Sequence, residues 1–546
     1  MYIHIRTHFM KNRYALIFIS MISIVIACHN KQSKRLERDT SITGKTSFNN
    51  LFVDSVQVEN FLAGHSEFKK FEDQYLDFYK QRNYEYAWFD TSGLVEQSHN
   101  FINLLNNTIS DLQDSSLYNA PLFGLYEALE KDAVEHKKKI DIEQTELLFT
   151  GQFFKYAAKV YKGSDIDAEE LGWFIPRKKV DLTALLDSSL KSKTASADQF
   201  KPLNPQYKLL QENLVKFFEL DKQTAGVWDS IPATAKLLLK KGDSAQIITQ
   251  IKSRLNLLGD MRVTDSSQKY DSALFVAAKR FQRRMGLSID GVIGAKMIEE
   301  LNVPVKQRIQ QLLVNMERVR WMPAEKDTNY IMVNIPEYKM HVYDSGKQIF
   351  DMNVIVGKAS NNTVIFTGNL KYIVFSPYWN VPISIVKNEV VSGMKRDKNY
   401  IQRNNMEITG TSNGLPIVRQ KPGPNNSLGL VKFLFPNNYD IYLHDTPNHE
   451  LFNVSTRSFS HGCIRISEPK KFAQYLLRSD TATTWKNNVI DSSMHLQKER
   501  WVTLKKTIPV FIVYFTAWVD KNGLLNFRKD IYGHDEKMSE KLFVKK

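Results

Sequence analysis

The hydrophobic periodicity of this chain changes near residue 330, and the change limits the folds that the chain can adopt. From about Leu51 to Asn302, apolar residues recur every three or four positions, as in amphipathic helices. From Tyr330 onward they alternate with polar residues around short turns, as in strands. A length of 546 residues allows about two to four domains. The pattern therefore predicts an α+β multidomain chain, with helical domains first and a β-rich domain last.

The first helical region, residues 51–235, is rich in aromatic side chains. Its clearest apolar stripe consists of Phe153, Tyr156, Ala157, Val160 and Tyr161. Such a stripe is typical of core packing and carries no chemistry of its own. We interpret this region as a helical scaffold domain.

A compact segment follows at residues 241–302. It reads as three short helices: one with Ile247, Ile251, Leu255 and Leu258 on one face, one capped by Asp271 or Ser272, and one after Asp290. Gly259 and Gly286 stand where the first two helices should end. The series "LNLLG", "FQRRMGL" and "DGVIG" resembles the peptidoglycan-binding domain, although Met297 replaces the threonine usual in that family. The resemblance implies that this module binds cell-wall glycan.

The strand region extends over residues 328–546. Hairpin turns are expected at Ser345-Gly346 and at Asn522-Gly523. Between Ile385 and Lys432 the strand signal weakens, and proline and glycine become frequent. A long insertion of this kind inside a strand domain is often a lid, so we expect one at about 385–432.

The amino terminus has the features of an export signal. Lys11 and Arg13 precede an apolar run from Tyr14 to Ala27, which is too short to span a bilayer comfortably. The run ends in "VIAC", which resembles a bacterial lipobox and implies lipidation of Cys28. We expect residues 1–28 to be a lipoprotein signal peptide and the polar residues 29–50 to be a tether. An uncleaved anchor and a plain secretory signal remain alternatives.

The chain is basic, since 74 Lys and Arg against 59 Asp and Glu give 74 − 59 = +15. Such a surface favours polyanions: nucleic acid, acidic lipid headgroups or an anionic wall polymer. The sequence has no zinc-finger spacing, no RNP-like strand and no P-loop, so we do not expect nucleic acid as a partner.

Only one cysteine besides Cys28 is present, in the stretch "FSHGCIRIS". A free thiol is mostly protonated at neutral pH, so nucleophilic catalysis by Cys463 needs a base nearby. His444 and His461 are the candidates, and His444 can meet Cys463 across neighbouring strand ends. Gly462 would leave room for backbone N–H groups to stabilise an oxyanion.

Two other readings of Cys463 exist. It can be a half-buried core residue. It can also be a zinc ligand together with His444, His449 and His461, but paired ligands at zinc-site spacing are missing, so we expect no metal.

The stretch "HDTPNHELFNVSTRSFSHGCIRI" resembles the signature of L,D-transpeptidases, the cysteine enzymes of bacterial cell-wall cross-linking. The likeness continues through "VRWMP", "VIVGK", "SLGLVKFLFPN" and "TAWVDKNGLLNFRKDIY". It departs from the family at Thr363-Val364, where relatives often have Thr-Pro, and this affects our expectation for the local loop only.

The resemblance implies roles for particular residues. Cys463 is the expected nucleophile, His444 the proton acceptor and donor, and the carbonyl of Asp445 the group that orients His444. Gly462 is expected at the oxyanion hole, and His461 in a supporting position. Ser460 and Tyr442 are expected to contact substrate, and Arg465 is expected either to hold a substrate carboxylate or to support the local fold. No cofactor is implied.

The resemblance implies a peptidoglycan L,D-transpeptidase that forms 3→3 cross-links through a cysteine thioester and releases D-alanine. An L,D-carboxypeptidase and a non-catalytic, peptidoglycan-tethering lipoprotein are the alternatives. The expected partners are stem peptides, glycan and, through lipid on Cys28, a membrane. The expected location is the periplasm of a bacterial cell envelope.

Overall fold

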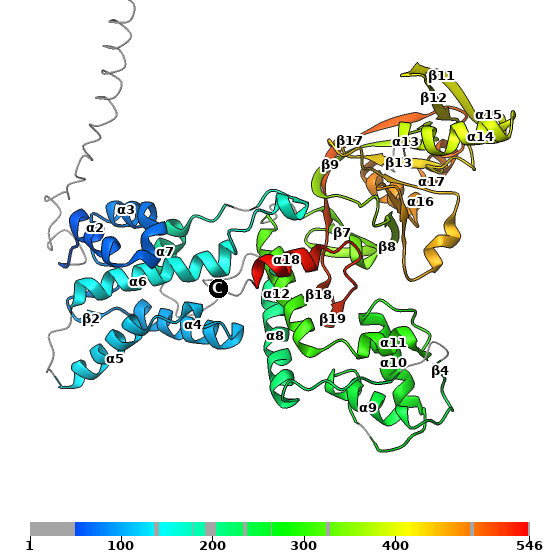
Figure 1. Ribbon diagram of the computed structural model, residues 1–546. Coiled ribbons are helices and arrows are strands. Elements are labelled where there is room, and N and C mark those ends of the chain that lie inside the picture. Colours follow the sequence, from blue (N-terminus) through cyan, green and yellow to red (C-terminus); the bar gives the residue numbers. More distant parts are fainter. Residues whose placement is uncertain are drawn as a thin grey trace, which may run out of the picture. The chain divides into compact units, whose positions relative to one another are not determined.

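The structure is a computed structural model that describes residues 50–135, 141–177, 179–191, 204–232, 237–263, 265–323, 328–480 and 485–543. The predicted signal peptide, nearly all of the tether and Cys28 lie outside these ranges. No helix within them has both the length and the apolar character needed to cross a membrane. The chain forms two compact units (Figure 1). Of the described residues, the first unit contains 50–105, 117–156 and 181–191, and the second contains the remainder.

The first unit is helical, as the periodicity predicts. Its elements are α2 (Ser55–Gly64), α3 (Glu72–Gln81), β1 (Phe89–Asp90), β2 (Gly93–Leu94), α4 (Glu96–Leu112), α5 (Ala120–Glu135), α6 (Ile142–Ala157) and α7 (Leu182–Lys191), of which α4 and α6 extend past its limits. All five residues of the predicted aromatic stripe are buried, as expected for core packing; Phe153 and Tyr156 belong to this unit, and Ala157, Val160 and Tyr161 belong to the second. The carboxylate of Glu146 is buried and accepts hydrogen bonds from the backbone N–H groups of Ala87 and Trp88.

The predicted three-helix segment is present in the second unit. It consists of β4 (Leu238–Leu239), α9 (Ile247–Leu257), α10 (Ser272–Arg284), β5 (Ile293–Gly294) and α11 (Ala295–Leu301). Asp271 is the N-cap of α10 and accepts a hydrogen bond from Leu274 N–H at 2.8 Å. Gly259 and Gly286 have φ of +77° and +70°, as expected at helix ends. The buried face of α9 is centred on Ile248 rather than on Ile247, which is only partly buried.

Three further helices of the second unit connect its parts: α8 (Pro205–Gln223), α12 (Val305–Trp321) and α18 (His534–Leu542). Arg320 on α12 donates to the hydroxyl of Tyr207 on α8 at 2.9 Å, and its guanidinium lies 4.8 Å from the centre of the Tyr207 ring. This contact helps to hold α8 against α12.

The β-rich domain is built on a barrel. Its strands are β3 (Trp173–Phe174), β6 (Tyr330–Asn334), β7 (Lys339–Asp344), β8 (Lys347–Gly357), β9 (Ile365–Phe375), β13 (Val431–Leu434), β14 (Leu443–His444), β15 (Ser458–Ser460), β16 (Ile464–Ile466) and β17 (Arg500–Val513). Eight of them pair in a closed ring, β13-β14-β16-β8-β7-β6-β17-β9 and back to β13. Closure leaves these strands without a free edge along their paired lengths. β3 and β15 pair with β9 and β8, respectively.

Both predicted hairpin turns are confirmed. Ser345 and Gly346 have φ of +51° and +74° between β7 and β8. Gly523 has φ of +75° between β18 (Ala517–Val519) and β19 (Leu525–Phe527). Positive φ at these positions matches the right-handed twist of the paired strands. Two helices, α16 (Pro469–Leu476) and α17 (Asn487–Ser493), complete the domain.

The expected insertion is a small subdomain with its own core. Its elements are β10 (Trp379–Asn380), α13 (Ile383–Ile385), a π-helix (Val386–Val390), α14 (Val391–Arg396), α15 (Tyr400–Arg403), β11 (Met406–Ser412) and β12 (Leu415–Gln420). Four buried valines, Val381, Val386, Val390 and Val418, form the core. The weak strand signal is misleading here, because β11 and β12 form a hairpin. No residue of β11 is fully buried, so its sequence has no apolar alternation.

Candidate active site

Cys463 and His444 are brought together by two neighbouring parallel strands. In the register of β14 and β16, Leu443 lies opposite Ile464 and His444 lies opposite Arg465. Because side chains alternate along a strand, Tyr442 and His444 share a sheet face with Cys463 and Arg465. The sequence therefore places the thiol, the imidazole and a guanidinium on one face of the barrel.

The turn that carries Cys463 is held by side-chain hydrogen bonds. Ser460 Oγ accepts the Gly462 N–H at 3.1 Å and donates to the Cys463 carbonyl at 2.6 Å. Thr363 Oγ1 donates to the Gly462 carbonyl at 2.8 Å. Gly462 itself has φ of +117°, and a Cβ there would meet nothing closer than the Asn362 carbonyl at 3.8 Å. Glycine is thus needed for its backbone conformation and not to make room.

Two of the predicted site residues have contacts within this turn. The Gly462 N–H donates to Ser460, and Ser460 is buried. Their expected roles at the oxyanion hole and in substrate contact stay predictions. Within the described ranges, the N–H of Cys463 itself donates no hydrogen bond and is the available donor. Thr363 supports the turn from a neighbouring loop. It was expected to affect only the shape of its own loop, and its contact with Gly462 could not be predicted because the two residues lie far apart in the sequence.

Burial disfavours the charged form of both the thiol and the imidazole. Cys463 Sγ donates to the Asp440 carbonyl at 3.5 Å, and the described contacts include no hydrogen bond between Cys463 and His444. Burial raises the pKa of Cys463, while hydrogen bonds from Tyr442 and the charge of Arg465 act to lower it. Burial, with the nearby positive charges of Arg465 and Lys432, lowers the pKa of His444 to about 3. Both shifts favour a neutral thiol and a neutral imidazole, so activation of Cys463 by His444 is expected to involve proton transfer.

The orientation of His444 is set by the residue that follows it. His444 Nδ1 lies 2.5 Å from the backbone carbonyl of Asp445. A neutral imidazole that donates from Nδ1 keeps Nε2 as its acceptor. The sequence interpretation expected this carbonyl as the orienting group.

The carboxylate of Asp445 has a different role from its carbonyl. Its Oδ2 accepts the Leu430 N–H at 2.8 Å, and its Oδ1 lies 3.3 Å from His449 Nε2. A Cβ on Gly429, which has φ of +62°, would lie 2.4 Å from this carboxyl group. Asp445 thus fixes the segment that returns from the insertion against the strand of His444.

Two cations flank His444. Lys432 on β13 lies opposite His444 on one side, and Arg465 on β16 lies opposite it on the other. Neither makes an ion pair with a carboxylate among the described residues, and Arg465 Nε is buried without a hydrogen-bond partner. The sequence interpretation did not identify Lys432 as a site residue, because its position beside His444 follows only from the strand register. These two residues place positive charge on both sides of His444, which favours an anionic group there.

His461 points away from this arrangement. Its side chain is 49% exposed, and its Nε2 lies 3.9 Å from Glu389 Oε1 in the insertion. Tyr442 does lie in the site, with its ring centre 5.7 Å from that of His444. His449 is exposed at a turn, and the described residues contain no group of three or more side chains placed to hold a metal ion.

Comparisons with known proteins assign families to parts of the chain. Residues 328–490 match the model of the YkuD family, described as "L,D-transpeptidase catalytic domain". Residues 73–214 match "Scaffold domain", and residues 244–301 match "Putative peptidoglycan binding domain". A protein of Haemophilus influenzae named "Putative L,D-transpeptidase" is 35% identical over 246 residues. That match covers 42% of this chain and 49% of the relative, so the chain spans about half of the relative's length.

Two solved structures also match. An L,D-transpeptidase from Xylanimonas cellulosilytica is 13% identical with a TM-score of 0.18, and the match covers 52% of this chain and 100% of that one. An L,D-transpeptidase from Stackebrandtia nassauensis is 16% identical with a TM-score of 0.21, covering 52% and 97%.

The matched ranges coincide with parts already described. The YkuD range contains most of the barrel strands together with Cys463 and His444, and the peptidoglycan-binding range contains α9, α10 and α11. The chain therefore carries a YkuD-family L,D-transpeptidase catalytic domain and a peptidoglycan-binding domain.

Proposed function

We propose that this protein is a cysteine-dependent L,D-transpeptidase that forms 3→3 cross-links in peptidoglycan. The observation that supports this most strongly is the placement of Cys463 and His444 on one sheet face, with His444 Nδ1 fixed by the Asp445 carbonyl. With Nδ1 as the donor, Nε2 of the neutral imidazole is the nitrogen that would accept the thiol proton.

The reaction begins with acylation. Cys463 Sγ attacks the carbonyl carbon that joins the third residue of a tetrapeptide stem to its terminal D-alanine. His444 Nε2 takes the thiol proton and passes it to the departing amine, so that a C–S bond forms, a C–N bond breaks and D-alanine leaves. The Cys463 N–H, which donates no hydrogen bond to the residues that the structure describes, would stabilise the oxyanion.

The second step resolves the thioester. The side-chain amine of a diamino acid on another stem attacks the thioester carbon, and His444 moves the amine proton to the departing Sγ. Two moderate barriers thus replace one difficult amide exchange.

The positive charges beside His444 make activation of the Cys463 thiol depend on bound substrate. Arg465 and Lys432 both lower the pKa of His444, so the free site has a weak base. A stem carboxylate bound between these cations would offset their charge and raise the basicity of His444. The thiol is then activated when substrate is present and remains protonated otherwise.

The carboxypeptidase alternative differs only in the acceptor, which is water. The insertion favours the amine acceptor, because Glu389 lies beside His461 on the Cys463 turn and the subdomain would restrict access of water. The non-catalytic alternative gains no support from a site with thiol, base and orienting carbonyl all in place.

Export and lipidation at Cys28 remain part of the proposal. They would hold the enzyme in the periplasm of a bacterial envelope, beside the wall. The mass of the mature protein should show an acylated Cys28, and an intact amino terminus at Met1 or Met10 would refute lipidation.

Product analysis tests the reaction. The full chain is incubated with a disaccharide tetrapeptide, and products are identified by mass spectrometry. We expect released D-alanine and a 3→3 dimer from wild type, and neither from Cys463→Ala. Tripeptide without dimer would establish the carboxypeptidase, and no D-alanine from wild type would refute the enzymatic proposal.

A further inference from the structure

The side chain of Asp445 is buried behind the proposed base His444. Because side chains alternate along a strand, the Asp445 carboxylate lies on the opposite sheet face from the imidazole. Asp445 is 3% exposed, and although its Oδ2 accepts the Leu430 N–H, its Oδ1 makes no hydrogen bond to any residue that the structure describes. A buried carboxylate oxygen without a partner is costly, so a neighbouring positive charge has a large effect on it.

His449 is the side chain placed to supply that charge. Its Nε2 lies 3.3 Å from Asp445 Oδ1, while its side chain is 54% exposed. It begins the short 3₁₀ helix His449–Asn453, and the centre of its ring lies 6.1 Å from that of the buried Phe452. The imidazole therefore covers the carboxylate from the surface side, where it can exchange protons with water.

The other charges near this pair are already matched. A pocket of about 480 Å³ beside Asp445 and His449 is also lined by Glu468, Lys470 and Lys471. Lys471 Nζ lies 2.9 Å from Glu468 Oε2, and Lys470 Nζ lies 2.6 Å from Asp491 Oδ1. Burial raises the pKa of Asp445, and the positive charge of His449 acts to lower it. His449 is thus the cation paired with Asp445 within the part of the chain that the structure describes.

Asp445 connects this pair to the imidazole of His444. Its carboxylate holds the Leu430 N–H at 2.8 Å, and its own N–H donates to the Val431 carbonyl at 3.0 Å. Its carbonyl lies 2.5 Å from His444 Nδ1, and the carbonyl of Leu428, in the same returning segment, also acts through a hydrogen bond to raise the pKa of His444. A loss of charge on the carboxylate would therefore loosen the peptide groups that orient the base.

We propose that His449 is a positioning residue for His444 and acts through the Asp445 carboxylate. Protonated His449 keeps that carboxylate charged, and the charged carboxylate holds residues 428–431 and the Asp445 carbonyl in the arrangement that fixes His444 Nδ1. Loss of the His449 proton weakens this support. The consequence for catalysis rests on the proposed function, whereas the effect on the geometry of His444 does not.

The NMR resonance of the His444 Nδ1 proton tests the effect on geometry without substrate. A proton that is donated to a carbonyl at 2.5 Å should resonate far downfield, and its loss in His444→Gln would assign it. Spectra of the full chain are recorded from about pH 5 to pH 8, the range in which histidines commonly change charge. The lowered pKa of His444, about 3, keeps its own ring neutral throughout. We expect the wild-type resonance to move over this range as His449 loses its proton.

Variants at His449 separate its charge from its size. In His449→Arg, which stays charged, the resonance should remain at its low-pH position over the whole range. In His449→Gln, which stays neutral, it should remain at its high-pH position. His495→Gln is the matched control and should follow wild type, since His495 is also exposed and its Nδ1 lies 2.8 Å from a backbone carbonyl. A resonance that does not move in wild type, or that moves equally in His449→Gln, would overturn the proposal.

Release of D-alanine from a tetrapeptide, measured at about pH 6, tests the consequence for catalysis. His449→Gln should lower kcat about threefold with KM unchanged, and His449→Arg should retain the wild-type kcat. Asp445→Asn should lower kcat at least about tenfold, and adding His449→Gln to it should cause no further loss. An unchanged kcat in His449→Gln, or a further loss in the double variant, would overturn the catalytic role. Absence of D-alanine release by wild type would count against the proposed function alone, because the resonance of His444 is measured without substrate.

Discussion

Arg465 acts on both partners of the proposed proton transfer. Its positive charge lowers the pKa of the Cys463 thiol and also that of His444. Removing the charge should therefore raise both values. In Arg465→Met, the thiol would be less ionised at a given pH, and alkylation of Cys463 by iodoacetamide at pH 8 should slow by about threefold or more.

Lys432→Met provides the contrast for this prediction. The charge of Lys432 lowers the pKa of His444 but is not among the causes that shift the pKa of Cys463. The pH profile of Cys463 alkylation in Lys432→Met should therefore match that of wild type. The measurement is the alkylation rate from pH 6 to pH 10, followed by mass spectrometry. An unchanged profile in Arg465→Met would show that its charge does not reach the thiol.

For single residues of the site, the sequence indicated which residue types carry the chemistry. It did not indicate which residues lie opposite one another on neighbouring strands. Cys463 and His444 were identifiable because the chemistry requires a thiol and a base, and the motif is specific. Lys432 could not be identified from the sequence, because its position opposite His444 depends on how β13 and β14 pair. Gly462 was identifiable from the motif, but the hydrogen bond from its N–H to Ser460 Oγ was not, because it depends on the shape of the turn.

Among the local elements, the turn of Cys463 depends on Thr363. Replacing it by valine removes a donor to the Gly462 carbonyl and an acceptor for the Gly357 N–H. Both groups are buried, so the cost should be about 1–3 kcal/mol, concentrated in this turn. We expect Thr363→Val to acylate at least about tenfold more slowly, with a larger fall in kcat than change in KM.

The control for Thr363 is Thr367→Val on β9. Thr367 Oγ1 also donates to a backbone carbonyl, that of Val510 at 3.1 Å, but away from the Cys463 turn. Its acylation rate should remain near wild type. Similar slowing in both variants would mean that loss of stability, not position of the thiol, causes the effect.

The inserted subdomain depends on its own small core. Val418 is buried in that core, whereas its neighbour Ile417 is 45% exposed. Val418→Ala should destabilise the subdomain by about 1–3 kcal/mol and open it to trypsin at the basic residues of α14 and α15. It should also raise the ratio of tripeptide to cross-linked dimer, as water gains access.

Ile417→Ala is the matched control, since it removes an exposed side chain from the same strand. It should leave both the trypsin cleavage rate and the product ratio unchanged. If Val418→Ala loosens the subdomain while the product ratio stays constant, the insertion does not exclude water from the thioester.

Elements with one buried face were predictable and exposed ones were not. Apolar and polar residues alternate along the β7–β8 hairpin because one face packs in the barrel. Its turn contains Ser345 and Gly346, which have positive φ, and such turns commonly contain glycine. The β11–β12 hairpin has little buried surface, so its pattern carries no such signal. An element can be predicted from the sequence when tertiary contacts bury one of its faces, because that burial requires a periodic pattern of apolar residues.

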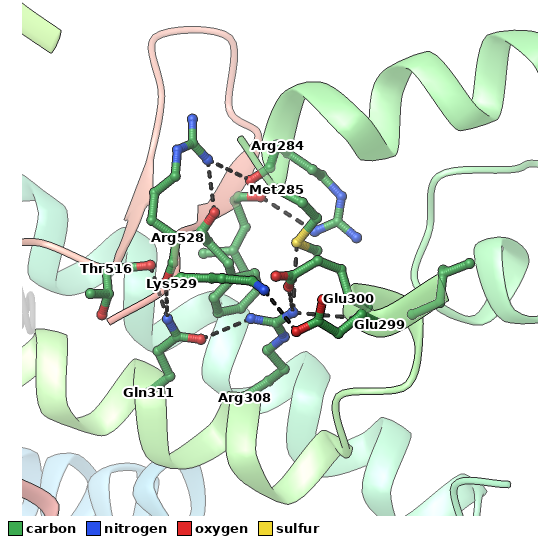
Figure 2. Close-up of polar contacts among 12 residues, drawn as sticks. Arg284, Met285, Glu299, Glu300, Arg308, Gln311, Thr516, Arg528 and Lys529 are labelled. Carbon is green, nitrogen blue, oxygen red and sulfur yellow. Dashed lines mark hydrogen bonds and ion pairs between the residues drawn. The ribbon is translucent and has the colours of Figure 1, made fainter. Parts of the chain in front are cut away.

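For the whole second unit, ion pairs differ greatly in importance (Figure 2). Arg308 and Glu300 form a buried pair at 2.6 Å, with side chains 8% and 7% exposed. Lys529 and Glu299 form a pair at 2.7 Å on the surface, 56% and 61% exposed. Arg308→Met would leave the buried carboxylate unpaired, at a cost of about 3–5 kcal/mol, whereas Lys529→Met should cost less than about 1 kcal/mol.

Thermal unfolding of the full chain measures both effects. The transition that includes the peptidoglycan-binding domain should move to lower temperature in Arg308→Met and stay in place in Lys529→Met. Equal shifts would contradict the larger stabilisation expected from the buried Arg308–Glu300 pair.

The order of domains was readable along the chain, because each has its own periodicity. The cavity that residues 204–209, 283–289 and 517–528 line could not be predicted, because these segments come together only in the folded protein. No pattern local to any of these segments indicates a shared site.

The central claim is that Cys463 forms a covalent acyl-enzyme with the stem peptide. The most direct measurement is the intact mass of the full chain after rapid mixing with a tetrapeptide and acid quench, followed by mapping of the modified residue. We predict an adduct with the mass of the tripeptide acyl group, on Cys463, formed in step with D-alanine release and absent from Cys463→Ala. Release of D-alanine by Cys463→Ala, or an adduct on another residue, would contradict the claim.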